Sequence, residues 1–194
     1  MHKIFITEGI VLGKRGIAEA NTLATILTDE LGLVRSRAQS ARLERSKLRF
    51  GLEPLTRGRF SLVRGRHEWR LTGTTDLVRD CIATNTSAGR SRAGKIAKLL
   101  VRLMPGEERV PGLYGEVVEG LQALARASES ELADTIECVL VLRVLSRLGY
   151  LPDNDTLTPF IERDFFSLEL AAEVAASRAL LVRTINESLK ATGL

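Results

Sequence analysis

Apolar and polar residues alternate along the first 75 residues with the two-residue period that is typical of β-strands. The expected strands cover residues 4–12, 21–28, 33–40, 55–63 and 68–72. In the third, Arg35 and Arg37 would share one face, while Val34, Ser36 and Ala38 take the other. Five short strands in this length predict a small closed barrel, of which the OB-fold is the commonest nucleic-acid-binding form. An SH3-like barrel is the alternative on strand count.

From residue 76 onward the apolar positions recur with a helical period. The expected helices cover residues 76–86, 91–103, 111–126, 128–148 and 167–190, and a further helix is expected to begin at Thr158-Pro159. The sequence therefore predicts an α+β protein with two domains. A five-stranded OB-type barrel over residues 1–75 would be followed by an all-helical domain over residues 76–194.

Composition is consistent with a packed globular chain, because 44% of the 194 residues are hydrophobic. No apolar run approaches the roughly 20 residues that span a bilayer, and the first residues lack a secretory signal. We therefore expect a cytoplasmic protein with no membrane partner. Cys81 and Cys138 lie in apolar surroundings and predict buried, reduced thiols.

Charge is unevenly distributed between the two halves. The formal net charge is +4, but residues 1–79 carry +7 and residues 80–194 carry −3. Between residues 35 and 70 there are 11 basic and 3 acidic side chains. A basic block of this kind predicts a polyanion site on the first half only, with a solvated basic surface as the alternative.

The candidate phosphate-contacting residues centre on the basic connection, residues 42–49, which we expect to form an exposed loop or short helix. Other basic residues could extend its surface from one face of the third strand, from the fourth strand and from the first hairpin. The full set is Lys14, Arg15, Arg35, Arg37, Arg42, Arg45, Lys47, Arg49, Arg57 and Arg59. Phosphates are the expected partners, because neutralising each one releases condensed counterions.

Base recognition is expected to be weak. Single-strand binders stack bases on exposed aromatic rings, and Phe50, directly after the basic connection, is the best candidate. Phe60 and Trp69 alternate with apolar residues and are expected in the core. The pattern thus favours binding through backbone phosphates with little dependence on base sequence.

Catalytic motifs are lacking in the sequence. It contains no nucleophile elbow, no Walker-type phosphate loop and no two-histidine metal motif. His2 and His67 are its only histidines, and the acidic pairs Glu107-Glu108 and Asp153/Asp155 lie in polar turns. We therefore expect a non-catalytic protein with no cofactor and no metal.

Several segments together resemble the bacterial RecO recombination-mediator family. They are GIVL at 9–12, EANTLATILTDELGL at 19–33, RSRAQSAR at 35–42, SKLR at 46–49, LEPL at 52–55 and LRVLSRLGYLPD at 142–153. The resemblance implies an OB-fold that binds single- and double-stranded DNA, and a helical second domain. It also implies strand annealing, and loading of recombinase onto strands coated by single-strand-binding protein, with a RecR-type partner. By matching position, the DNA-contacting role would fall to Arg35, Arg37, Arg42, Lys47 and Arg49.

The sequence departs from this family in three ways. Many members carry four zinc-binding cysteines after the LGY-x-P-D turn, but residues 154–164 contain none, so no zinc is expected. Gln39-Ser40 replaces a basic–glycine pair in the third strand. The chain is also shorter than typical members, so DNA binding is expected to carry over better than the mediator role. The alternative functions are an adaptor whose basic barrel docks an acidic peptide, and an RNA-binding OB protein.

Overall fold

The computed structural model describes residues 3–17, 19–82, 87–104, 106–151, 154–162 and 168–193. These residues form two compact units. One unit combines the chain up to Cys81 with residues 97–109, and the other combines residues 82–96 with the chain from Val110 onward. The proposed domain boundary after residue 75 stays a prediction.

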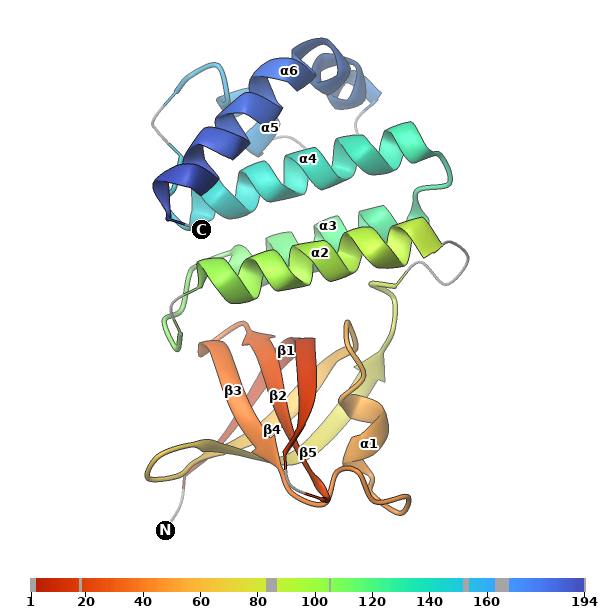
Figure 1. Cartoon of the computed structure of the whole chain (residues 1–194), viewed down its shortest axis with the longest axis vertical. Helices are drawn as coiled ribbons and strands as arrows, with labels where there is room; N and C mark the ends of the chain where they lie inside the picture. The colour runs from red at the N-terminus through yellow and green to blue at the C-terminus, as the bar shows by residue number, and fades with distance from the viewer. Residues whose placement is uncertain are drawn as a thin grey trace. The chain divides into compact units, whose positions relative to one another are not determined.

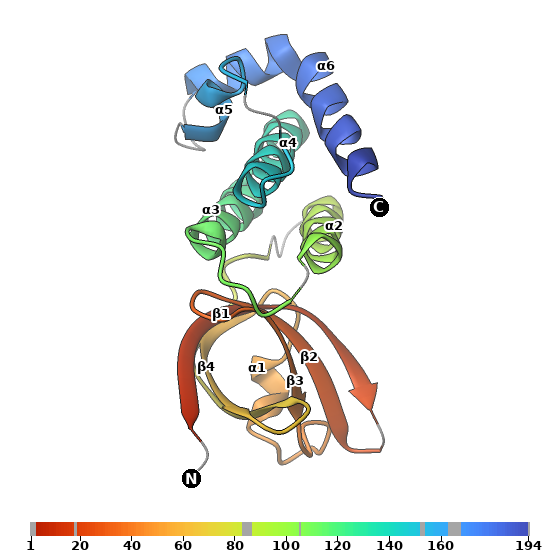
Figure 2. The same ribbon diagram turned by 90° about the vertical axis from the view of Figure 1, so that its left-hand side faces the viewer.

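The first unit is a closed barrel of five strands (Figures 1 and 2). The strands are β1 (Ile4–Ile17), β2 (Asn21–Thr28), β3 (Gly32–Ala38), β4 (Arg57–Arg64) and β5 (Trp69–Val78), in the spatial order β1-β2-β3-β5-β4. The long strand β1 pairs with β4 through its first half and with β2 through its second. A short parallel pairing of β3 with β5 closes the barrel. This confirms the OB-type barrel followed by helices that the sequence predicted.

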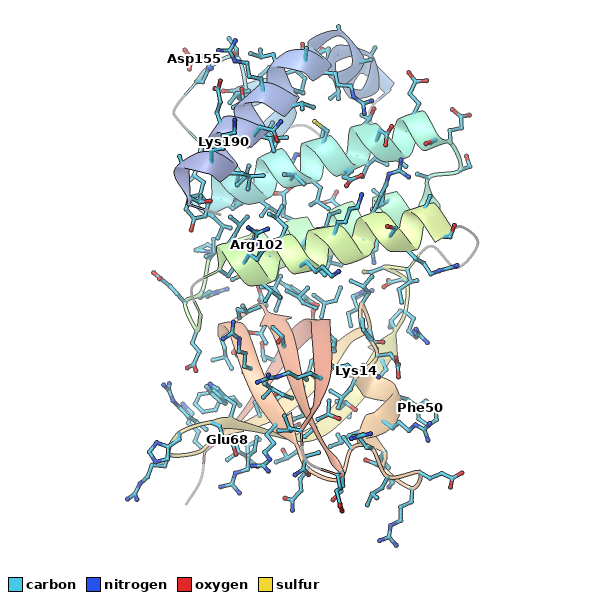
Figure 3. The ribbon with its side chains drawn as sticks, viewed as in Figure 1. Lys14, Phe50, Glu68, Arg102, Asp155 and Lys190 are labelled. Carbon is cyan, nitrogen blue, oxygen red and sulfur yellow. The ribbon has the colours of Figure 1, made fainter. Side chains whose placement is uncertain are left out.

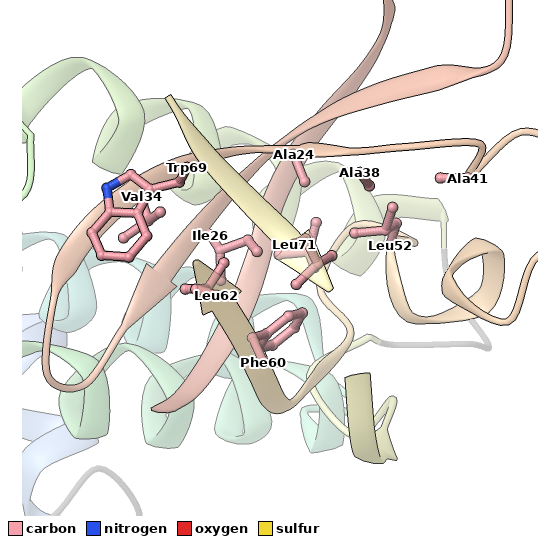
Figure 4. Close-up of a cluster of buried hydrophobic side chains, with 11 residues drawn as sticks. Ala24, Ile26, Val34, Ala38, Ala41, Leu52, Phe60, Leu62, Trp69 and Leu71 are labelled. Carbon is pink, nitrogen blue, oxygen red and sulfur yellow. The ribbon is translucent and has the colours of Figure 1, made fainter. Parts of the chain in front are cut away.

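The barrel interior is filled by apolar side chains from all five strands and from the segment that precedes β4 (Figure 4). They are Val11, Ala24, Ile26, Val34, Ala38, Ala41, Leu52, Phe60, Leu62, Trp69 and Leu71. Phe60 is fully buried and Trp69 is 4% exposed, so both expected core aromatics are confirmed. Burial of this set, at roughly 25 cal/mol per Å² of apolar surface, fixes which side chains of each strand face outward.

Two expectations about the barrel are wrong. The helix expected from residue 76 is absent up to Val78, because β5 continues through that position and pairs Val78 with Arg57 across an irregularity in the register. Residues 83–86 lie outside the described part. The first strand does not end at residue 12, because β1 extends to Ile17 and pairs Lys14 and Arg15 with Ala24 and Leu23, so both residues lie in a paired strand of the first hairpin and not in its turn. In both places, cross-strand pairing overrides a local sequence pattern.

Residues 106–108 pass unusually close to the start of β3. The Leu33 backbone N–H donates to the Gly106 carbonyl oxygen at 3.1 Å. Gly32 has φ +68°, and a Cβ built there would lie 2.2 Å from the Glu108 carbonyl oxygen. Only glycine satisfies both the backbone angle and the close approach. Arg109 strengthens the contact, since its Nε donates to the Asp29 carbonyl oxygen at 3.0 Å.

The helices are α1 (Leu48–Gly51), α2 (Ser87–Leu103), α3 (Leu113–Arg126), α4 (Ser130–Arg147), α5 (Thr158–Glu162) and α6 (Leu168–Ala191). In the second unit α4 packs against α3, α5 and α6. Gly120 of α3 allows close packing, because a Cβ there would lie 2.6 Å from a methyl group of Leu140. No helix in the described ranges combines the length and the apolar character needed to span a membrane.

Candidate nucleic-acid interface

Four of the predicted cations line one hollow on the barrel, which we call the basic hollow. Its volume is about 450 Å³, and it is lined by Lys14, Arg15, Gly16, Thr22, Ala41, Arg42, Arg49, Leu52 and Glu53. The end of β1 supplies Lys14 and Arg15, whereas Arg42 and Arg49 come from the segment between β3 and β4. Residues far apart in the sequence thus form one cationic surface. Gly16 leaves room for Arg42, because a Cβ there would lie 3.2 Å from the Arg42 Nη1.

The positive charge of the basic hollow is only partly compensated. Lys14 Nζ forms an ion pair with Glu53 Oε1 at 2.6 Å. Arg15 and Arg49 are exposed and have no carboxylate within ion-pair distance among the described residues. Glu53 is the one acidic residue in the lining. An unpaired guanidinium beside a hollow is suited to bidentate binding of a phosphate.

A second hollow, the β2–β3 groove, adjoins the basic hollow and shares Lys14 and Arg15 with it. Its volume is about 650 Å³. Its apolar lining includes Leu12, Leu23 and Val101, and its cations are Lys14, Arg15, Arg35, Lys98 and Arg102, with no acidic residue. Arg102 can be located in Figure 3. An apolar floor with a cationic rim is suited to a ligand that carries both apolar and anionic groups.

Sequence reasoning missed Lys98 and Arg102. Both belong to the part of α2 that packs with the barrel in one unit. They are four residues apart and therefore lie on one face of the helix, one turn apart. This spacing can be read from the sequence, within a helix that was correctly expected. The sequence does not show, however, that this face of the helix lies beside the cations of the barrel.

The basic connection forms an exposed loop and the short helix α1, as expected. Arg45 and Lys47 are exposed and line none of the hollows described here. Phe50 is 72% exposed beside Arg49, so its ring is accessible for stacking. Figure 3 shows Phe50 on the α1 side of the barrel. The stacking role itself stays a prediction.

Three other candidate cations are held by carboxylates. Arg57 forms a bidentate pair with Asp80, with Nη2 2.6 Å and Nε 2.9 Å from its two oxygens. The Nε of Arg59 lies 3.6 Å from the Asp76 Oδ2. Arg37 Nη1 lies 3.2 Å from the Glu68 Oε1. The structure therefore brings Lys14, Arg15, Arg35, Arg42 and Arg49 together and leaves Arg57 and Arg59 in pairs apart from them.

The Arg57–Asp80 pair also shapes the chemistry of Cys81, which is fully buried as expected. Burial, the Asp80 charge and a hydrogen bond from Sγ to Asp80 Oδ1 at 3.5 Å together raise the pKa of the Cys81 thiol to about 12. Burial also raises the pKa of the half-buried Cys138 thiol. Because the thiolate is the reactive form, a raised pKa suppresses reactivity.

We expect Cys81 to resist thiol reagents in the folded protein at neutral pH and to react fully after denaturation. Single Cys81→Ser and Cys138→Ser variants show which of the two thiols accounts for each phase of the labelling reaction. Since the pKa of Cys81 in the folded state lies above the ordinary thiol value of 9.0, the stability contributed by keeping this thiol protonated is fully present below pH 9.0. That contribution is lost as pH rises through about 12. Rapid labelling of Cys81 in the native protein would contradict the buried Asp80 contact.

No group of three or more His, Cys, Asp or Glu side chains is placed to hold a metal ion within the described residues. The residues that line the two hollows and their edge supply guanidinium and ammonium groups, one accessible ring (Phe50) and an apolar groove.

An OB-type barrel followed by a helical unit places this chain in the class of proteins that join an OB-fold to a helical domain, and the outer face of its barrel is rich in cations. Residues 1–75 match the family model described as recombination protein O, N terminal, and residues 91–156 match the one described as recombination protein O, C terminal. The chain belongs to the RecO family, as the sequence segments predicted.

Three curated relatives carry the name DNA repair protein RecO. The protein from Heliobacterium modesticaldum is 30% identical over 152 residues, covering 78% of this chain and 54% of the relative. That from Dehalococcoides mccartyi strain CBDB1 is 28% identical, covering 77% of this chain and 58% of the relative. That from Bifidobacterium longum subsp. infantis is 30% identical, covering 77% and 62%. The chain thus spans little more than half the length of these relatives.

Proposed function

We propose that this protein is a non-catalytic DNA-binding protein of recombinational repair that holds single- and double-stranded DNA by its phosphates. The observation that carries the proposal is the continuity of the basic hollow with the β2–β3 groove. Together they gather seven cations, Lys14, Arg15, Arg35, Arg42, Arg49, Lys98 and Arg102, with Glu53 as the one carboxylate in their linings. We call this set the basic face. Family membership supports the same function.

The chemistry of the basic face favours contact with the DNA backbone over base reading. Guanidinium and ammonium groups bind phosphate oxygens whatever the base. The one exposed ring beside them, Phe50, supplies stacking that every base can accept. The β2–β3 groove offers the bases an apolar floor. The protein would therefore tolerate many sequences, as a protein that promotes strand annealing or recombinase loading must.

The partners in this proposal follow from the resemblance to RecO proteins. They are a RecR-type protein and strands coated by single-strand-binding protein, and the site of action would be chromosomal DNA in the cytoplasm. The phosphate surface lies wholly in the barrel unit. DNA binding can therefore be tested separately from these protein partners.

The test is fluorescence anisotropy of a labelled, mixed-sequence single strand of about 30 nucleotides, titrated at several salt concentrations. Each phosphate contact on a single strand contributes about −0.7 to the slope of log K against log salt. Four or more contacts from the basic face predict a slope of about −3 or steeper. Absence of binding at low salt would refute the proposal, and an RNA strand of equal length establishes whether DNA is preferred.

The β2–β3 groove supports a second candidate function, an adaptor that docks an acidic peptide with apolar side chains. Its five cations and its apolar lining suit such a segment as well as a nucleic acid. Competition separates the two functions. An acidic peptide that displaces labelled DNA at micromolar concentration would favour shared use of the groove, and a peptide without effect would leave the DNA function alone.

A further inference from the structure

Three arginines form a row across four neighbouring strands of the barrel, although one of them was not among the predicted site residues. Arg15 of β1 pairs with Leu23 of β2, Leu23 pairs with Arg37 of β3, and Arg37 pairs with Arg70 of β5. Residues paired in register point to the same side of a sheet, and Arg70 is exposed between the buried Trp69 and Leu71. The row therefore lies on the outer surface.

The spacing of this row suits an extended backbone that crosses the strands. Neighbouring strands lie about 4.8 Å apart, so Arg15 and Arg37 are separated by roughly 10 Å and Arg37 and Arg70 by roughly 5 Å. Successive cations are thus within reach of successive phosphates. Leu23, half-buried between two arginines, provides an apolar contact in the same row.

Further hollows continue the surface along the same direction. The Trp69 hollow, of about 500 Å³, shares Leu23 and Arg35 with the β2–β3 groove and reaches Arg64 and His67. The hairpin hollow, of about 640 Å³, shares His67 and Glu68 with the Trp69 hollow and is lined by Arg37, Arg66 and Arg70. Figure 3 shows Glu68 on the opposite side of the barrel from Phe50, so the four hollows together cross the barrel.

Two arginines at the far end of this extension are suited to an anionic ligand, whereas the Trp69 hollow also contains Glu68 and Glu107, and Glu107 pairs with Arg64 at 3.3 Å. Arg66 and Arg70 are exposed and have no carboxylate within ion-pair distance in the part of the chain that is described. Trp69 is 4% exposed, and its Nε1–H has no hydrogen-bond acceptor among the described residues.

We propose that the path of the single strand continues beyond the basic face, across β3, to the hairpin between β4 and β5, with Arg66 and Arg70 as phosphate contacts. This inference rests on the proposed DNA-binding function and adds a second half to its site. Glu68 holds Arg37 at 3.2 Å in the free protein. Arg37 would exchange this carboxylate for a phosphate when the strand reaches it.

The experiment compares oligothymidylates of about 6 and about 20 nucleotides, since OB-folds occupy roughly 4 to 16 nucleotides. A short strand can make all its phosphate contacts on the basic face, whereas a long strand would also contact Arg66 and Arg70. In the double variant Arg66→Ala/Arg70→Ala we expect affinity for the long strand to fall about tenfold or more at low salt and the salt slope to flatten by about 1.4. Affinity for the short strand should be unchanged.

The matched control is Arg183→Ala/Lys190→Ala, which removes two exposed charges from α6 in the helical unit. This control loses the same net charge without losing the proposed phosphate contacts, so it shows how much of the change in affinity is due to net charge alone. The variant Glu68→Gln frees Arg37 and should tighten long-strand binding several-fold. Arg66→Gln/Arg70→Gln, which keeps polar side chains, replaces the alanine variant if that variant does not fold by circular dichroism.

The outcomes separate this inference from the function on which it rests. A wild-type protein that binds neither strand refutes DNA binding altogether. Equal affinity of the hairpin variant and the wild type for the long strand refutes the extended path alone. An equal loss in the α6 control also refutes it, since net charge would then explain the effect. Unchanged binding in Glu68→Gln would remove Arg37 from the path.

Discussion

Replacing Arg15, Arg35 and Arg49 with alanine is expected to weaken binding to single-stranded DNA by roughly 100-fold or more at about 50 mM salt. The three guanidinium groups belong to the basic face, are exposed and have no carboxylate partner among the described residues. Each lost contact removes a counterion-release contribution, so the salt slope should flatten by about 2 units. Fluorescence anisotropy at several salt concentrations measures both quantities.

The comparison variant for this experiment is Arg45→Ala/Lys47→Ala/Arg49→Ala, which removes the same charge from the basic connection. Arg45 and Lys47 line none of the four hollows, so this variant should lose clearly less affinity than the first. Both variants should weaken all base sequences about equally, because phosphates carry the contacts. Wild-type affinity in a folded Arg15/Arg35/Arg49 variant would refute the assignment of the basic face.

Replacing Glu116 with alanine is expected to destabilise the helical unit by about 3 to 5 kcal/mol. Glu116 lies on α3, and its Oε1 accepts a hydrogen bond from Arg143 Nη1 at 3.0 Å while its Oε2 accepts one from Arg147 Nη2 at 3.2 Å. The Arg143 and Glu116 side chains are 5% and 9% exposed. Removal of the carboxylate would take away an ion-pair partner of both guanidinium groups, one of which is buried.

Thermal unfolding followed by far-ultraviolet circular dichroism measures this loss, which should lower Tm by roughly 10 °C in a chain of this size. Glu119→Ala is the matched control. Glu119 is exposed, lies three residues further along α3 and forms no ion pair within the described residues, so its replacement should change stability by about 0.5 kcal/mol or less. DNA binding by the barrel should persist in both variants below their unfolding temperatures. Equal Tm values for the two variants would show that the buried pair does not stabilise the unit.

The identity of the elements could be predicted from the sequence with few errors, because each element buries one face. Period-two alternation around Val34 and Leu62 indicated strands, and helical spacing around Leu140 and Leu145 indicated a central helix; both patterns reflect burial that any compact fold requires. The wrong prediction of a helix at residues 76–78 also arises because periodicity reports only which side chains are buried. Asp76-Leu77-Val78 fits either period, and only the partner strand β4 decides that it is paired as β5.

The candidate site was predicted less completely than the fold. Excess positive charge in the first half, and the absence of catalytic motifs, are properties of composition and indicated a polyanion-binding protein. Which cations act together depends on pairing partners that are distant in the sequence. Nothing in the sequence distinguishes Arg57 from Arg15 as a candidate phosphate contact. In the structure, Asp80 holds Arg57 in a bidentate pair, whereas Arg15 lines two hollows.

The sequence by itself thus determined the order of strands and helices, the buried aromatic residues, the RecO resemblance and the excess charge of the first half. Only the tertiary structure decided that β1 continues past residue 12 and pairs Lys14 and Arg15 with β2, and that Lys98 and Arg102 line the same groove. It also decided that Arg15, Arg37 and Arg70 form one row. The physical reason is that burial and periodicity are local properties of a chain, whereas ion pairing and surface continuity are set by barrel closure.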